Sequence, residues 1–210
     1  MSSQYFPTGT VYGVLLNFSA ERAALAAQMS QPPYKAPPQA PVLYVKTANT
    51  WSGNGASVSV PARVAQVEVG ATVAMVVGPV VQYVLMNDLS IPHASYFRPP
   101  VKFKCLDGFL GIGSQLVPVD DPAAFKLDVR INGSLQQTVD FSNLVRNAQT
   151  LIRDVAEFMI LREGDVLMLG CDCLPGGGRP LATVGDIVQI SAPSHPAVGV
   201  LTNTLAAETV

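Results

Sequence analysis

An apolar stretch at residues 69–86 constrains the fold of this chain more than any other segment. Its length approaches the roughly 20 residues that a membrane-spanning helix needs. Gly78 and Pro79 interrupt it, however, and valines at every second or third position favour β-strands. The stretch therefore predicts two buried strands, at residues 71–77 and 80–87, joined at Gly78-Pro79. It argues against insertion into a membrane.

The composition excludes two broad classes of protein. Hydrophobic residues make up 49% of the 210 residues, which is enough apolar surface to exclude intrinsic disorder. The net charge of −2 argues against a nucleic-acid partner, because phosphate binding needs a basic face. Charged residues make up only 13%, about half the roughly 25% of an average soluble protein. So few charges predict a large sheet area, an oligomer interface or a surface that a partner covers.

The first residues and the cysteines indicate the compartment. The segment MSSQYFPTG has no basic part followed by an apolar part, so no secretion signal is expected. Three cysteines, an odd number, do not predict a disulfide framework. We therefore expect a reducing, cytoplasmic location.

The remaining patterns predict a mostly β chain with two helices. Further strands are predicted at residues 11–18, 42–46, 57–61, 125–131, 135–140, 166–169 and 187–190. Ser19 is the expected N-cap of a helix at residues 20–29, and Ser142 that of a long helix reaching about Met159. We expect one domain over residues 1–210. Its lid region, at residues 19–41, combines the first helix with a proline-rich loop.

Few side chains of the types that carry out catalysis are present. His195 lies in a predicted turn and is expected at the surface, whereas His93 follows the second apolar strand and is a candidate site residue. Cys171 and Cys173 have one residue between them, which does not match zinc-ligand spacing, so both are expected in or near the core. The glycines at residues 176–178 precede Arg-Pro, which excludes a phosphate-binding loop.

Polar side chains gather in the irregular segment at residues 91–118 and just before it. They are Asp88, His93, Arg98, Lys102, Lys104 and Asp107. One interpretation is a cationic pocket for a carboxylate substrate, in which Arg binds bidentately and Lys supplies a point charge. The alternative is a solvated loop whose Lys and Asp side chains pair locally. The residues alone leave both interpretations open.

Several motifs, in the same order, resemble those of the fumarylacetoacetate hydrolase superfamily. The matching segments are NDLS (87–90), KCLDGF (104–109) with GIG (111–113), EGDVLMLG (163–170), and GDIV (185–188) with GVLTN (199–203). QPPYKAPP (31–38), YVKTANT (44–50) and YFRPPVKFKCLDG (96–108) are most similar to one branch, the N-terminal halves of the bifunctional decarboxylase/isomerases of 4-hydroxyphenylacetate (homoprotocatechuate) breakdown. The resemblance covers nearly the whole chain. It implies the mixed β-roll of that superfamily, mostly β with a few helices.

The resemblance also implies a divalent Mg or Mn ion, which the family holds with an E-x-E pair and the Asp of the ND motif. Asp88 matches that Asp, but the E-x-E positions are Gly70 and Thr72. With Asp88 as the only matching metal ligand, we expect weak metal binding or none. The family's His-x-x-Glu pair in the lid helix corresponds to Glu21 and Ala24, so this acid–base pair is absent too.

Two functions of different classes follow from the resemblance. In the first, the chain is an enzyme that decarboxylates 5-carboxymethyl-2-oxo-hex-3-ene-1,6-dioate, isomerises 2-hydroxyhepta-2,4-diene-1,7-dioate, or does both. The implied roles are dienolate stabilisation by Lys104, proton transfer by Asp88 or His93, and binding of the dicarboxylate or tricarboxylate 2-oxo acid by Arg98, Lys46 and Asp107. In the second, the chain is a catalytically degenerate structural subunit. Either function implies a homodimer, or a heteromer with a sister subunit that binds the metal.

Overall fold

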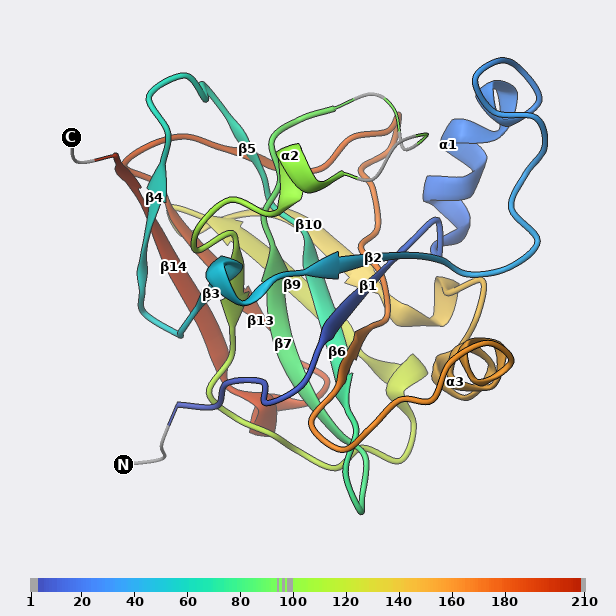
Figure 1. Ribbon diagram of the computed structural model, residues 1–210. Helices are drawn as coiled ribbons and strands as arrows, with labels where there is room; N and C mark the ends of the chain where they lie inside the picture. The colour runs from blue at the N-terminus through green and yellow to red at the C-terminus, as the bar shows by residue number, and fades with distance from the viewer. Residues whose placement is uncertain (1–3, 94, 96, 98–99, 209–210) are drawn as a thin grey trace.

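Two packed β-sheets form the framework of the computed structural model, which describes residues 4–93, 95, 97 and 100–208 (Figure 1). The strands of the first sheet are β1 (Val11–Leu15), β2 (Val42–Lys46), β3 (Trp51–Ser52), β6 (Ala71–Val76), β7 (Gln82–Asp88), β8 (Leu110–Ile112) and β11 (Val166–Met168). Their order is β2-β1-β11-β6-β7-β8-β3, with β1–β11 and β3–β8 parallel and the other pairs antiparallel. The edge strands β2 and β3 come early in the chain, whereas β11, which lies between β1 and β6, comes late. The sheet therefore joins segments that are distant in the sequence.

The second sheet is smaller and lies behind the first in the view of Figure 1. Its strands are β4 (Ser57–Val60), β9 (Lys126–Ile131), β10 (Ser134–Asp140), β13 (Ile187–Ser191) and β14 (Val200–Ala207), in the order β10-β9-β13-β14-β4. A third pair consists of β5 (Val67–Glu68) and β12 (Leu181–Ala182). The predicted mostly β architecture is confirmed.

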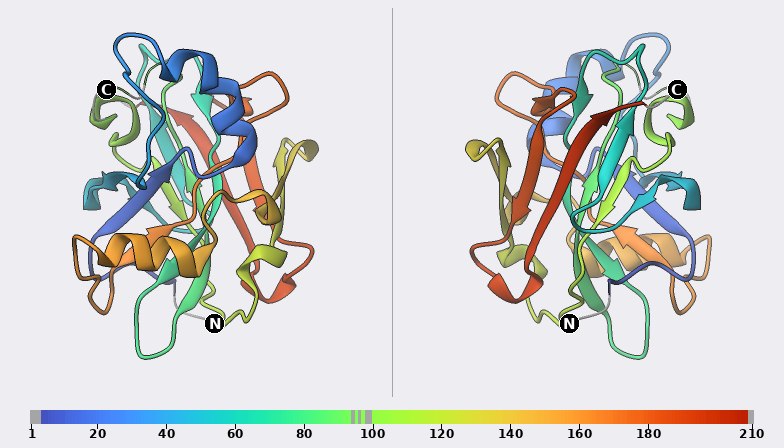
Figure 2. Two further views of the ribbon diagram at one scale, coloured as in Figure 1. Left: turned by 90° about the vertical axis from the view of Figure 1, so that its right-hand side faces the viewer. Right: turned by 90° about the vertical axis from the view of Figure 1, so that its left-hand side faces the viewer.

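Three α-helices accompany the sheets. They are α1 (Ser19–Met29), α2 (Val101–Lys104) and α3 (Ala148–Ala156). Single 3₁₀ turns occur at Ala48–Thr50, Pro122–Ala124, Phe141–Asn143 and Pro196–Val198. Helices α1 and α3 both lie at the edge of the sheets that is on the right in Figure 1, and this edge faces the viewer in the left view of Figure 2. None of the helices in the described part of the chain is long and apolar enough to cross a membrane.

The hairpin of β6 and β7 explains the apolar stretch at residues 69–86. Every residue of β6 is buried, because one face of the strand packs between the two sheets and the other packs beneath β1 and β2. Val73 belongs to the hydrophobic cluster between the two sheets, and Ala74 belongs to the cluster on the other face of the strand. A strand that is covered on both faces has a continuous apolar sequence rather than an alternating one.

The long helix predicted from Ser142 is wrong in its first part. Leu144 forms a β-bridge with Phe18, and the N–H groups of Val145 and Arg146 donate to the backbone oxygen and to Oδ1 of Asn17, at 2.8 and 3.0 Å. These contacts take the backbone groups that a helix would use. Helix α3 therefore begins only at Ala148, after the N-cap Asn147.

The N-cap predicted at Ser19 is also wrong. Phe18 is the N-cap of α1 and makes no side-chain cap, whereas Ser19 is the first helical residue and donates its hydroxyl to the backbone oxygen of Asn143 at 3.0 Å. The predicted strand at residues 11–18 ends earlier, because Leu16 has a φ of 59° and turns the chain toward α1.

Two motif residues meet between the sheets. Asn87 of the ND motif, on β7, donates Nδ2 to Oδ1 of Asn203 in the GVLTN segment, on β14, at 3.3 Å, and both are fully buried. Gly111 leaves the space that the Asn203 amide fills, since a Cβ there would overlap it. Strand β14 itself was not predicted, although its residues alternate between buried and partly exposed up to Ala206.

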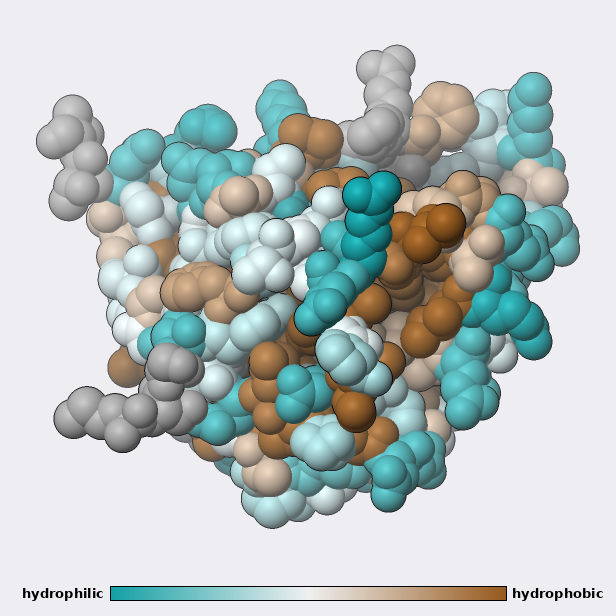
Figure 3. All heavy atoms as spheres, turned by 60° about the horizontal axis from the view of Figure 1, so that its bottom comes forward, coloured by the Kyte–Doolittle hydropathy of each residue, from teal (hydrophilic) through white to brown (hydrophobic). Residues whose placement is uncertain are grey.

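The face that carries the tip of the β6–β7 hairpin shows hydrophobic side chains among hydrophilic ones (Figure 3). A shallow groove lies between this hairpin and the end of α3. It is lined by Val77, Val81, Ile152, Ala156, Met159, Ile160 and Leu161. Ile160 is 86% exposed, so part of the apolar surface that the low charge content predicted is found here.

The observed cap of α3 is open to a direct test. Asn147 Oδ1 accepts a hydrogen bond from the N–H of Thr150 at 2.9 Å. We expect Asn147→Ala to lower the free energy of unfolding by about 1 kcal/mol. Ser142→Ala, which removes only an exposed hydroxyl contact with Asp140, should cost a few tenths of a kcal/mol. Urea denaturation measures both, and a larger loss in Ser142→Ala would contradict the assigned cap.

Candidate functional site

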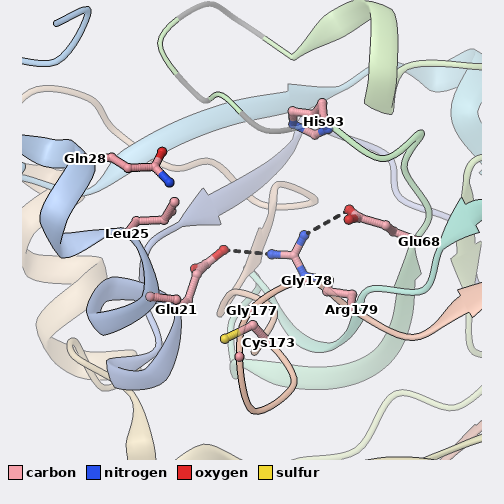
Figure 4. A pocket seen from close by; sticks show the side chains of 11 residues that line it. Glu21, Leu25, Gln28, Glu68, His93, Cys173, Gly177, Gly178 and Arg179 are labelled. Atoms are coloured by element: carbon pink, nitrogen blue, oxygen red, sulfur yellow. Dashed lines mark hydrogen bonds and ion pairs between the residues drawn. The ribbon is translucent and has the colours of Figure 1, made fainter. Parts of the chain in front are cut away.

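A cavity of about 250 Å³ opens between α1, the segment around β5 and the loop that precedes β12 (Figure 4). Its lining consists of Glu21, Ala24, Leu25, Gln28, Glu68, His93, Cys173, Gly176, Gly177, Gly178 and Arg179. Three of these side chains carry full charges and point toward one another in Figure 4: Glu21, Glu68 and Arg179. The cavity is large enough for a small organic acid.

Arg179 is the central cation of this cavity. It is only 6% exposed, and one Nη atom donates to Glu21 at 2.8 Å while the other lies 3.8 Å from Glu68. Glu21 is fixed in turn, because its second oxygen accepts the N–H of Leu16 at 2.7 Å. The guanidinium therefore links the lid helix α1 to β5 across the cavity.

Burial changes the proton affinity of two cavity residues. It raises the pKa of Glu21 above its usual value, although Arg179, the Leu16 N–H and Lys104 act in the opposite direction. Burial lowers the pKa of His93, and the positive charges of Lys104 and Arg179 lower it further. Near pH 7 the imidazole is therefore neutral. Its ring stacks on Phe103 with a centroid distance of 4.7 Å.

The glycine run at the mouth of the cavity requires glycine for its conformation. Gly176, Gly177 and Gly178 have φ values of 92°, 94° and 71°, a region that residues with a Cβ rarely adopt. No other side chain or backbone atom would contact a Cβ at Gly176 or Gly178, so conformation and not crowding selects glycine. The turn brings the chain back toward α1 and positions Arg179.

A second group of charges is buried beside this cavity. Asp88 lies between Lys46 and Lys104, with Nζ–Oδ1 and Nζ–Oδ2 distances of 3.0 and 2.6 Å, and all three side chains are at most 1% exposed. Tyr44 donates its hydroxyl to Asp88, and its ring lies under the Lys104 ammonium at 5.1 Å. Gly13, opposite Tyr44 on β1, leaves room for that ring.

Asp88 stays ionised in this environment. Burial alone would raise the pKa of its carboxyl group, but Lys104, Lys46 and the Tyr44 hydroxyl hold it well below the usual value. Burial lowers the pKa of Lys46, opposed by the Asp88 charge. The cluster of Lys46, Asp88 and Lys104 has a net charge of +1, and Lys104 acts on both Glu21 and His93 in the neighbouring cavity.

The structure brings only some of the predicted site residues together. Lys46, Asp88 and Lys104 meet in the buried cluster, and His93 lines the cavity. Asp107 is exposed and accepts a hydrogen bond from Asn49 at 2.6 Å, away from both. Lys102 is exposed, and Arg98 lies outside the described residues.

Arg179, Glu68 and Tyr44 were not predicted as site residues. Arg179 was considered only as evidence against a phosphate-binding loop, and the sequence signal that could have found it is a rare cation directly after three glycines. Arg179 and Glu21 are 158 positions apart, so their contact and their burial cannot be read from the neighbouring residues of the sequence.

The positions that would complete a metal site do not fit a divalent ion. Gly70 lies directly opposite Asp88 and accepts its N–H at 2.8 Å, and a Cβ at Gly70 would overlap the backbone oxygen of Asp88. Thr72 is buried, and its hydroxyl donates to the backbone oxygen of Val73 at 3.2 Å. In the described ranges, no group of three or more His, Cys, Asp or Glu side chains could hold a metal.

Comparison with known proteins identifies relatives of the chain. The family model described as "Fumarylacetoacetate (FAA) hydrolase C-terminal" matches residues 10–206. A 4-hydroxyphenylacetate degradation bifunctional isomerase/decarboxylase from Salmonella dublin is 34% identical over 203 residues, which are 90% of this chain and 46% of the relative. The chain thus spans about half the length of this relative and of two further bifunctional isomerase/decarboxylases from Escherichia coli.

Solved structures share the fold. A 5-carboxymethyl-2-hydroxymuconate delta-isomerase from Mycobacterium smegmatis superposes with a TM-score of 0.73 at 22% identity, over 96% of this chain and 80% of the other. A maleylpyruvate hydrolase from Sphingobium sp. SYK-6, solved with manganese(II) and pyruvate, gives 0.72 at 20% identity, over 97% and 72%. These likenesses confirm the predicted fold class.

The close approach of Gly70 to Asp88 predicts a stability effect. We expect Gly70→Ala to lower the free energy of unfolding by roughly 1–3 kcal/mol, because the added methyl group forces the β6 and β7 backbones apart. Gly78→Ala is the matched control. A Cβ at Gly78 has its nearest neighbour at 3.5 Å, so this variant should be close to wild type. Equal stability of both variants in urea denaturation would contradict the packing described here.

Proposed function

Because this chain belongs to the fumarylacetoacetate hydrolase family, we propose that it is an enzyme acting on small 2-oxo acids with two or three carboxylates. The favoured reactions are decarboxylation of 5-carboxymethyl-2-oxo-hex-3-ene-1,6-dioate and isomerisation of 2-hydroxyhepta-2,4-diene-1,7-dioate. The names of its relatives support this choice, as they combine an isomerase and a decarboxylase in 4-hydroxyphenylacetate breakdown. The proposal includes a cytoplasmic location.

The observation that carries the proposal is the cavity around Arg179. A guanidinium whose two Nη atoms each face a different carboxylate can exchange one of these carboxylates for a carboxylate of the substrate. Burial acts against the ionised form of Glu21 and raises its pKa, which lowers the cost of exchanging its carboxylate for one of the substrate. Arg179 is thus proposed as a further substrate-binding residue, and the roles expected of Arg98 and Asp107 stay predictions.

We assign the proton transfers of the reaction to Glu21 and His93. Loss of CO₂ leaves a dienolate, and isomerisation of the dienol passes through the same kind of anion, so both reactions need a proton delivered to carbon. Both groups line the cavity. The raised pKa of Glu21 favours its protonated carboxyl group, which can donate the proton to carbon. The lowered pKa of His93 favours the neutral imidazole, which can accept the proton that isomerisation removes from the dienol hydroxyl. Asp88, which is ionised and enclosed by two ammonium groups, is better suited to hold Lys46 and Lys104 than to carry a proton.

Lys104 acts on this anion through its field. It is fully buried and does not line the cavity, yet its charge lowers the pKa of both Glu21 and His93. A positive charge fixed in a low-dielectric interior stabilises a negative charge that develops nearby. We therefore keep Lys104 as the electrostatic stabiliser, without direct contact to the substrate.

The second candidate function is a structural subunit without activity of its own. It is favoured by Gly70 and Thr72, which replace two carboxylates, and by the match to only 46% of a bifunctional relative. An assay separates the two candidates: the purified chain is given the tricarboxylate substrate with and without Mg²⁺ or Mn²⁺. Decarboxylation by the chain alone supports the enzyme. Activity only after addition of a metal-binding sister subunit supports the structural role.

Removal of the cavity cation should weaken the binding of 2-oxo dicarboxylates. We expect Arg179→Gln to weaken the affinity for 2-oxoglutarate, used as the probe, by roughly 10- to 100-fold, which is the share of a charge-assisted bidentate pair. Arg153→Gln, at a side chain that is 72% exposed, should bind like wild type. Calorimetry measures the affinities and circular dichroism checks folding. Unchanged affinity in a folded Arg179→Gln protein contradicts the assigned site.

The raised pKa of Glu21 predicts a pH dependence of binding. Ionised Glu21 competes with the ligand for Arg179 and repels its carboxylates, so the affinity for 2-oxoglutarate should rise as pH falls toward the pKa of Glu21. One coupled proton gives at most about a tenfold change per pH unit. Glu21→Gln should remove this dependence, whereas Glu157→Gln, at the exposed end of α3, and His93→Gln should retain it. A wild-type affinity that is constant between pH 5 and 8 would contradict the role of Glu21.

A further inference from the structure

The Lys46 ammonium lies in a shell of oxygen atoms. Its Nζ is 3.0 Å from Asp88 Oδ1, 2.7 Å from the backbone oxygen of Phe109 and 3.4 Å from that of Leu89, and it also donates to the backbone oxygen of Lys104. One carboxylate and three carbonyl groups surround it. Oxygen shells of this kind are typical of bound cations, and here a side chain of the protein supplies the cation.

The second ammonium group occupies the remaining side of Asp88. Lys104 Nζ is 2.6 Å from Oδ2, and the Tyr44 hydroxyl donates to the same atom. Both carboxylate oxygens therefore already face positive or donor groups. A divalent ion at Asp88 would place two further positive charges against these two ammonium groups, in an interior where all three side chains are at most 1% exposed.

The charges balance without a metal. The resemblance implies three carboxylates and one divalent cation at these positions, which together carry −1. Asp88 alone also carries −1, since Gly70 and Thr72 are uncharged. The negative charge lost with the two carboxylates thus equals in magnitude the positive charge lost with the cation. Lys46 and Lys104 therefore face a net charge of −1 in either case. A divalent ion added to Asp88 would instead bring the buried cluster from +1 to +3.

We propose that Lys46 and Lys104 alone supply the positive charge that Asp88 needs, so that this site takes no divalent cation and the chain folds and holds Asp88 in place without a metal. The site is a built-in cation site whose two occupants are covalently attached ammonium groups. This inference does not depend on the proposed reaction, because its test contains no substrate. The test therefore fails or succeeds separately from the assignment of the activity.

The first measurement uses the unaltered protein. Mn²⁺ is titrated into the purified chain, and electron paramagnetic resonance counts the free ion. We expect no stoichiometric binding and a melting temperature that neither Mg²⁺, Mn²⁺ nor EDTA shifts. A stoichiometric Mn²⁺ site that disappears in Asp88→Asn would overturn the proposal.

The second measurement tests the ammonium groups. Lys104→Met leaves the Asp88 carboxylate with a single cation and should lower the melting temperature by roughly 6–20 °C, whereas Lys102→Met, at an exposed neighbour, should have no effect. Combining Lys104→Met with Asp88→Asn restores the charge balance, so the double variant should lose less than the sum of the single variants. Strict additivity would overturn the proposal. Failure of Lys104→Met to fold leaves the Mn²⁺ titration of the wild type decisive.

Discussion

The ion pairs of Asp88 with Lys46 and Lys104 hold together the parts of the molecule on which the candidate site depends. Asp88 ends β7, Lys46 ends β2 and Lys104 ends α2, so three segments that are far apart in the sequence meet at one carboxylate. Each of these charges is buried, and a buried charge is tolerated only when partners compensate its lost hydration. The position of each segment is therefore tied to that of the other two.

The cavity depends on a second network of charged side chains, whose net charge has the opposite sign. Arg179 compensates Glu21 and partly compensates Glu68, which leaves this group with a net charge of −1 beside the +1 of the lysine cluster. Cys171 lies between the two groups, and burial raises the pKa of its thiol to about 12, so that it acts as an apolar spacer rather than a nucleophile. Two opposite networks side by side make the cavity sensitive to the charge of whatever enters it.

Packing explains why several family motifs have the residues they do. Asn87 and Asn203 come from two motifs that are more than 100 positions apart, yet they hydrogen-bond between the sheets, and Gly111 of a third motif leaves space for them. Gly164 and Gly185, the glycines of the two Gly-Asp pairs, have φ values of 89° and 96° before β11 and β13. These motif residues support the framework, whereas Gly70 and Thr72 stand at the positions where the family has its metal-binding carboxylates.

The amino-acid sequence was sufficient to predict the two strands of the hairpin at Gly78-Pro79 and the loss of the two metal-ligand positions, because each is a property of neighbouring residues or of a matched motif. Only the tertiary structure decided where α3 begins, since Asn17 takes the backbone groups of residues 145 and 146. It also decided that Lys104 is enclosed while Lys102 is solvated, and that Arg179 faces Glu21. Burial and long-range pairing depend on how distant segments pack, and no local pattern records them.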